Sequence, residues 1–205
     1  MKLEIKFGID FEIERVEQTL AKMDWFDSHG YKPKLPQGVG RSSSAQEIKA
    51  SVLREFDEKK LKEVSDKIFF DFSKIEKQFS KKSKEVFKNN FPEIFFVYLT
   101  NYGVGGSYGF PNKVAVNINA DVFRIIIHEI IHLFIEESVQ KYGIEHWEKE
   151  RVVDLILNSK EFGFLNCQGW QGGYQGAEKY IDLLFNDLFF KYPEEFFSEI
   201  KKVRE

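Results

Sequence analysis

Residues 126–134 read IIHEIIHLF and place three ionisable side chains, His128, Glu129 and His132, in the most apolar segment of the chain. Burying a charged group is costly unless it is paired or bound to a metal. Residues i and i+4 of a helix lie one turn apart on the same face, so His128 and His132 can direct their imidazoles at one cation. Apolar residues surround them on nearly every side, which is typical of a buried helix. The stretch therefore predicts a central helix that carries a metal site.

The spacing of these three residues is the HExxH signature of zinc metallopeptidases. Tetrahedral zinc binds histidine nitrogen at about 2 Å. Glu129 is rotated away from the two histidines, where it can take a proton from metal-activated water and later deliver it to a leaving amine. The alternative is a core helix in which hydrogen bonds satisfy both histidines and a salt bridge satisfies Glu129. That alternative needs separate partners for three buried groups, whereas one zinc ion with its water accounts for all three.

A catalytic zinc site needs a third protein ligand and an open fourth position. The metzincin pattern is excluded, because the positions three and six residues after the second motif histidine hold Ile135 and Ser138. In the following segment, EHWEKERVVDLIL, Glu150 and Asp154 share one face of a helix. We expect Glu150 to be the third ligand. We expect Asp154 to accept a hydrogen bond from a ligand imidazole, since such carboxylates fix the histidine tautomer.

Other residues stay open for two roles. For the third ligand, the main rival of Glu150 is His146 on the same helix face, followed by Glu136 and Glu137 late in the motif helix. The reaction also needs a hydrogen-bond donor that stabilises the oxyanion of the tetrahedral intermediate. The candidates for that donor are His146, Tyr174, Trp170 and Tyr142.

A family resemblance follows from these motifs. HExxH followed by an E-x-x-x-D helix, with Glu150 18 residues after His132, resembles the gluzincin clan of zinc peptidases. The short spacing is similar to that of the compact minigluzincins. The resemblance covers roughly residues 93–158 and leaves the first 90 or so residues unmatched.

The resemblance implies a zincin-like fold and a set of roles. It implies that the zinc ligands are His128, His132 and Glu150. Glu129 would be the general base, and Asp154 would support a ligand. The KVAVNIN segment, residues 113–119, would be the edge strand that pairs with an extended peptide. The chain has no Gly-x-Met-x-Asn strand motif, which argues against the large aminopeptidase branch.

The bulk composition is that of a globular domain. The chain has 205 residues, of which 42% are hydrophobic and 31% are charged. This is enough apolar material for a hydrophobic core, and the excess of one charge sign is too small to suggest disorder. A net charge of −3 does not indicate nucleic-acid binding. No apolar run approaches the ~18 residues of a membrane span. The single cysteine, Cys167, excludes an intrachain disulfide. The first 20 residues lack the apolar core of a signal peptide, so we expect a cytoplasmic protein without membrane or nucleic-acid partners.

Periodicity predicts an α+β fold, in which a small mixed sheet is backed by helices and a helical C-terminal part follows the central HExxH helix. Strands are expected at 3–11, 93–100 and 113–119, and the last two can pair antiparallel. Helices are expected at 12–23, 45–89 (two, or one bent), 121–140, 145–159, 177–191 and 193–203. Long loops are expected at 29–46, 101–112 and 163–176. We treat the chain as one domain with three parts, 1–90, 91–140 and 141–205.

The expected function is zinc-dependent hydrolysis of peptide bonds in a peptide or protein substrate. The alternative is a degenerate, non-catalytic zincin-like module that binds a protein or peptide partner. The intact Glu129 favours the enzyme, since zinc binding alone does not require it. A DNA-linked regulator is disfavoured by the acidic balance and by the lack of a clear helix-turn-helix. The oligomeric state does not follow from the sequence.

Overall fold

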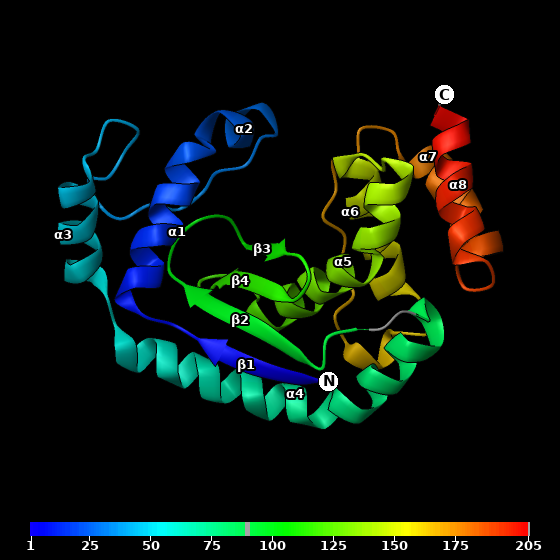
Figure 1. The fold of residues 1–205 in the computed structure, drawn as a ribbon, viewed down its shortest axis with the longest axis horizontal. Coiled ribbons are helices and arrows are strands. Elements are labelled where there is room, and N and C mark those ends of the chain that lie inside the picture. The colour runs from blue at the N-terminus through cyan, green and yellow to red at the C-terminus, as the bar shows by residue number, and fades with distance from the viewer. Residues whose placement is uncertain (89–90, 205) are drawn as a thin grey trace. The chain divides into compact units, whose positions relative to one another are not determined.

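The computed structural model describes residues 1–88 and 91–204 and has a mixed α+β fold (Figure 1). The strands are β1 (Lys2–Lys6), β2 (Ile94–Thr100), β3 (Gly106–Gly109) and β4 (Lys113–Asn117). The helices are α1 (Ile9–Ala21), α2 (Met23–Ser28), α3 (Ala45–Glu55), α4 (Glu58–Phe87), α5 (Val122–Tyr142), α6 (His146–Asn158), α7 (Glu178–Leu184) and α8 (Pro193–Arg204). Two short segments, η1 (Gly163–Leu165) and η2 (Phe185–Phe189), are 3-10 and π-helical. Within the described ranges, no helix combines the length and apolar character that crossing a bilayer requires.

The four strands form one sheet in the order β1-β2-β4-β3. β1 and β4 both pair parallel with β2, and β3 pairs antiparallel with β4. The expected antiparallel pairing of the segments 93–100 and 113–119 is therefore wrong, since Val97 lies opposite Val114 in a parallel ladder. The reason is the unexpected strand β3 within the glycine-rich segment 101–112. Because of it the chain reverses twice between β2 and β4.

The position of β4 corrects a second expectation. β4 lies between β2 and β3, so the segment 113–119 is an inner strand and cannot be the edge that accepts a peptide. The two edges of the sheet are β1 and β3. β3 reads GSYG, and because glycine has low strand propensity, its sequence predicts a loop rather than a strand.

The N-terminal strand is shorter than expected. β1 ends at Lys6, and the residues from Ile9 onward are helical. The alternating pattern LEIKFGIDF runs into a second, helical pattern with apolar residues three or four positions apart. The members of that pattern that pack on the core are Ile9, Ile13, Val16 and Leu20. The helix consequently begins before the expected residue 12.

Most helix boundaries were anticipated within a few residues. Ser44 and Glu47 form the expected capping box, in which Glu47 N donates to Ser44 Oγ and Ser44 N donates to Glu47 Oε2. The 45–89 segment forms two helices, α3 and α4, and its expected end at residue 89 lies outside the described residues.

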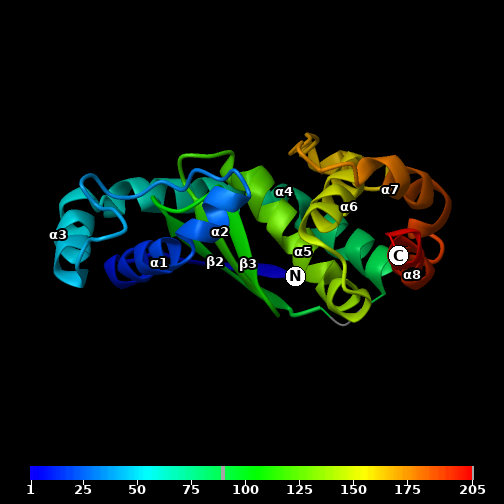
Figure 2. The ribbon, with the colours of Figure 1, turned by 90° about the horizontal axis from the view of Figure 1, so that it is seen from above.

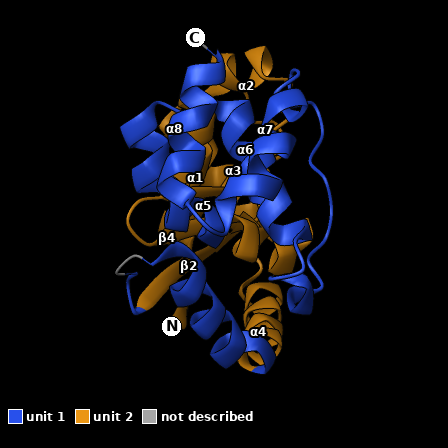
Figure 3. Ribbon diagram, turned by 90° about the vertical axis from the view of Figure 1, so that its right-hand side faces the viewer, with its two compact units in different colours: residues 1, 74–93, 130–205 blue, residues 2–73, 94–129 orange. Residues whose placement is uncertain are grey.

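The chain divides into two compact units (Figure 3). Unit 2, residues 2–73 and 94–129, contains the whole sheet, α1 to α3, and the first parts of α4 and α5. Within it α1 lies beside α3 (Figures 1 and 2). They pack around a core cluster made of Val16, Ile48, Val52 and Tyr102. A second group of buried side chains comes from the strands: Leu3, Phe95, Val97, Leu99, Val114 and Val116.

Unit 1, residues 1, 74–93 and 130–205, holds the second parts of α4 and α5 and everything that follows α5. Its core is rich in phenylalanine, as the composition of the chain suggests. Fully buried rings are Phe79, Phe162, Phe189 and Phe196. Edge-on contacts join several of these rings, and such contacts add to the stability from area burial alone.

Candidate metal centre

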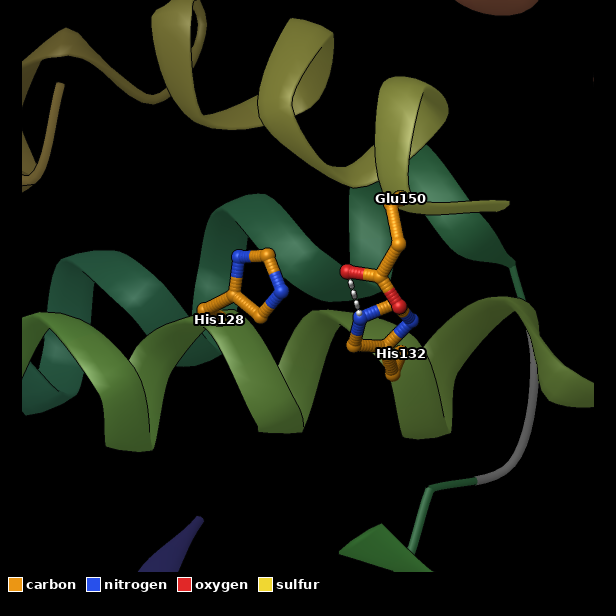
Figure 4. Close-up of side chains that lie close together, drawn as sticks. All are labelled: His128, His132 and Glu150. Carbon is orange, nitrogen blue, oxygen red and sulfur yellow. Dashed lines mark hydrogen bonds and ion pairs between the residues drawn. The ribbon is translucent and has the colours of Figure 1, made fainter. Parts of the chain in front are cut away.

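His132 and Glu150 are in direct contact inside unit 1. Glu150 Oε2 on α6 lies 3.2 Å from His132 Nε2 on α5 (Figure 4). Both residues are buried, with 1% exposure for His132 and 6% for Glu150. At the start of α6, Glu148 Oε2 accepts a hydrogen bond from Glu145 N at 2.7 Å, which caps the first turn of the helix that carries Glu150.

His128 lies one turn before His132 on the same helix, α5. One ligand atom from each of His128, His132 and Glu150 can be chosen so that the three atoms lie within 4.8 Å of one another (Figure 4). Among the described residues, this is the group of histidine, cysteine and acidic side chains that can hold a metal ion. Two imidazoles and one carboxylate fit the three-ligand set of a catalytic zinc site. The three residues predicted as metal ligands therefore lie close together, and their role as ligands stays a prediction.

The rivals of Glu150 as third ligand lie outside this group. His146 Nδ1 is 3.7 Å from Glu150 Oε1, so His146 contacts the candidate ligand, and its ring is partly exposed. Glu136 and Glu137 do not belong to the group found among the described residues. The geometry therefore favours Glu150 over His146, Glu136 and Glu137.

Asp154 anchors the glutamine- and glycine-rich loop that follows α6. Its Oδ2 accepts hydrogen bonds from Tyr174 Oη at 2.5 Å and from Gln171 N at 2.7 Å. Burial, together with the hydrogen bond to Asp154, raises the pKa of the Tyr174 hydroxyl. Asp154 itself is fully buried. The predicted role of Asp154 toward a ligand imidazole stays a prediction.

The candidate oxyanion donors have other partners in the structure. The hydroxyl of Tyr174 would have to leave Asp154 before it could donate to a substrate. Tyr142 Oη donates to Glu194 at 2.9 Å. Trp170 lies over the guanidinium of Arg151, 4.4 Å from it.

Glu129 is buried against the glycine-rich segment of unit 2. Its side chain is 7% exposed. A Cβ atom on Gly106 would lie 2.5 Å from Glu129 Oε1 and would also overlap the side chain of Ile125. Only glycine therefore lets the start of β3 approach the carboxylate this closely.

Arg15 on α1 supplies a buried positive charge within the same unit. It is 8% exposed, and its Nη1 donates to Ser107 Oγ on β3 at 3.1 Å. Burial lowers the pKa of the guanidinium, and the negative charges of Glu129 and Glu12 act in the opposite direction. The sequence gives no sign that Arg15 is buried, because an arginine in the segment FEIERVEQTL has the pattern of a solvated helix face.

Comparisons of the chain with protein-family models, with curated proteins and with solved structures found no significant match.

Proposed function

We propose that the protein is a zinc-dependent metallopeptidase of gluzincin type that hydrolyses peptide bonds with metal-activated water. One observation carries the proposal: the ligand atoms of His128, His132 and Glu150 approach within 4.8 Å of one another, and Glu129 directly follows the first of them. A cytoplasmic location remains our expectation, since the chain has a single cysteine.

His128, His132 and Glu150 would hold the metal. Zinc bound by three protein side chains supplies Lewis-acid activation of water and of the substrate carbonyl. Glu129 accepts the proton of the attacking water and returns it to the leaving amine. The burial of Glu129 excludes bulk water from its carboxylate, which strengthens its interactions with a reacting group.

The substrate peptide is placed along β3 in this proposal. β3 is an edge of the sheet, so one side of its backbone can pair with an extended chain. Its first residue, Gly106, is in contact with Glu129. A peptide paired with β3 would thus run next to the general base. The same contact supports the enzyme over a non-catalytic peptide-binding module, since binding alone does not require a carboxylate there.

The test is cleavage of a mixed peptide library by the zinc-loaded protein, followed by mass spectrometry. Glu129→Gln keeps the size of the side chain and removes the base, so cleavage should fall by about 10²–10⁴-fold. Glu137→Gln, an exposed glutamate on the same helix, is the matched control and should cleave like the wild type. Wild-type cleavage no faster than that of Glu129→Gln would refute the peptidase and leave the non-catalytic module.

A further inference from the structure

Arg15 is a buried cation with few hydrogen-bond partners. A guanidinium carries five N–H donors. Within the described residues, the guanidinium of Arg15 makes one hydrogen bond, from Nη1 to Ser107 Oγ. Nε is buried and has no acceptor in the described part of the chain. Leaving a buried donor unfilled is costly, so such a group calls for an explanation beyond packing.

The glycine-rich segment lies directly on this guanidinium. A Cβ atom on Gly103 would be 2.7 Å from Arg15 Nε and 2.8 Å from Nη2. Three residues later, Gly106 makes the equivalent close approach to Glu129. The segment 103–107 therefore lies against Arg15 at Gly103 and through the Ser107 side chain, and against Glu129 at Gly106.

Arg15 is itself held by α1 and by its charged neighbours. Glu12, one turn earlier on α1, accepts hydrogen bonds from Thr100 and from both nitrogens of Asn101 at the end of β2. That network ties α1 to the sheet. The guanidinium interacts electrostatically with Glu129 and with Glu12, and both interactions favour its charged form.

We propose that Arg15 is a positioning residue for the peptidase reaction: it holds the start of β3 against Glu129, so that the peptide-binding edge and the general base keep a fixed spacing. The hydrogen bond to Ser107 and the contact with Gly103 fix the two ends of the segment that passes over Glu129. This inference rests on the proposed function. Errors of about 1 Å in the placement of reacting groups cost up to about 100-fold in rate, so the expected effect is large.

The test is a double-mutant cycle on Arg15 and Ser107, with kcat/KM measured on a peptide that the wild type cleaves. Arg15→Met and Arg15→Lys should each lower kcat/KM about tenfold or more, because neither side chain offers the guanidinium fork. Ser107→Ala should lower it several-fold. The double variant Arg15→Met/Ser107→Ala should be no worse than Arg15→Met alone, since both changes remove the same tether.

The matched control is Arg54→Met. Arg54 also donates to a serine hydroxyl in unit 2, that of Ser51, but it is exposed on α3. Its kcat/KM should equal that of the wild type. Zinc content and melting temperature are measured for every variant, and activity is expressed per folded, zinc-loaded molecule. A role in folding alone would leave this normalised value unchanged.

Two results would overturn the inference while the peptidase stands. In the first, the kcat/KM of Arg15→Met lies within twofold of the wild-type value. In the second, the losses in kcat/KM from Arg15→Met and from Ser107→Ala multiply in the double variant. If Arg15→Met does not fold, Arg15→Lys with Ser107→Ala completes the same cycle. A wild type that cleaves no better than Glu129→Gln would refute the peptidase and the role of Arg15 together.

Discussion

Gly106 and Glu129 are so close that a Cβ atom on Gly106 would lie 2.5 Å from Oε1 of the glutamate. Gly106 begins β3, and Glu129 lies on α5 directly after the first candidate ligand. A strand that approaches a buried carboxylate so closely tolerates no side chain at that position. This contact explains why a glycine occupies the first position of this edge strand.

Gly106→Ala should lower both stability and peptide cleavage. The added methyl forces Glu129 and Ile125 to move, and overpacking of this kind costs about 1–3 kcal/mol. We expect cleavage to fall at least tenfold, because the displaced group is the proposed base. Gly109→Ala at the other end of β3 is the control, since its Cβ would meet only Lys113 at an ordinary 3.7 Å. Equal effects of the two substitutions on thermal unfolding and on the rate would contradict this account.

Tyr174→Phe should destabilise the protein by about 2 kcal/mol, the usual scale for losing a buried hydrogen bond to a charged group. The lost bond is the one from Tyr174 Oη to Asp154 Oδ2. Tyr98→Phe removes a hydroxyl for which the described residues record no hydrogen bond, and should change stability by less than about 0.5 kcal/mol. Urea denaturation measures both. A fall in kcat with unchanged stability would show that Tyr174 acts on the substrate, the role suggested for it by sequence.

The buried carboxyl of Glu12 should make the stability of the folded protein depend on pH, with a sign that follows from its raised pKa. Burial raises the pKa of Glu12 above its ordinary value of 4.5, although hydrogen bonds from Thr100 and Asn101 act against this. Above pH 4.5 the folded protein therefore keeps a proton that the unfolded chain has released, and its stability falls as pH rises through the raised pKa.

Glu12→Gln removes that proton-binding group. The wild type should therefore be most stable relative to Glu12→Gln near pH 4.5. Its free energy of unfolding, relative to that of the variant, should decrease as the pH rises toward about pH 7. Urea denaturation across this range provides the measurement. A relative stability that grows with pH would mean that the hydrogen bonds outweigh burial and that the pKa is lowered.

The sequence predicted the part of the site that depends on local spacing. His128 and His132 are one helical turn apart whatever the rest of the chain does, and the E-x-x-x-D spacing fixes Glu150 and Asp154 on one face of α6. The capping box at Ser44 is equally local, and it was also predicted.

What the sequence could not predict depends on contacts between distant segments. Arg15 and Ser107 are 92 positions apart and meet only because α1 and β3 belong to the same unit. The pairing of β2 with β4 was misjudged because the intervening strand β3 is rich in glycine, which has little strand propensity of its own. Its order comes from pairing with β4 and from the contact with Glu129.

The most direct test of the metal centre is the zinc content of freshly purified protein, measured for the wild type beside Glu150→Gln and His146→Gln. The two variants remove neighbouring candidates, since His146 Nδ1 lies 3.7 Å from Glu150 Oε1. We predict about one zinc ion per chain in the wild type and in His146→Gln, and its loss from Glu150→Gln. A wild-type protein that binds no zinc, even when zinc is added back, would contradict the account and make residues 126–134 a core helix with paired histidines.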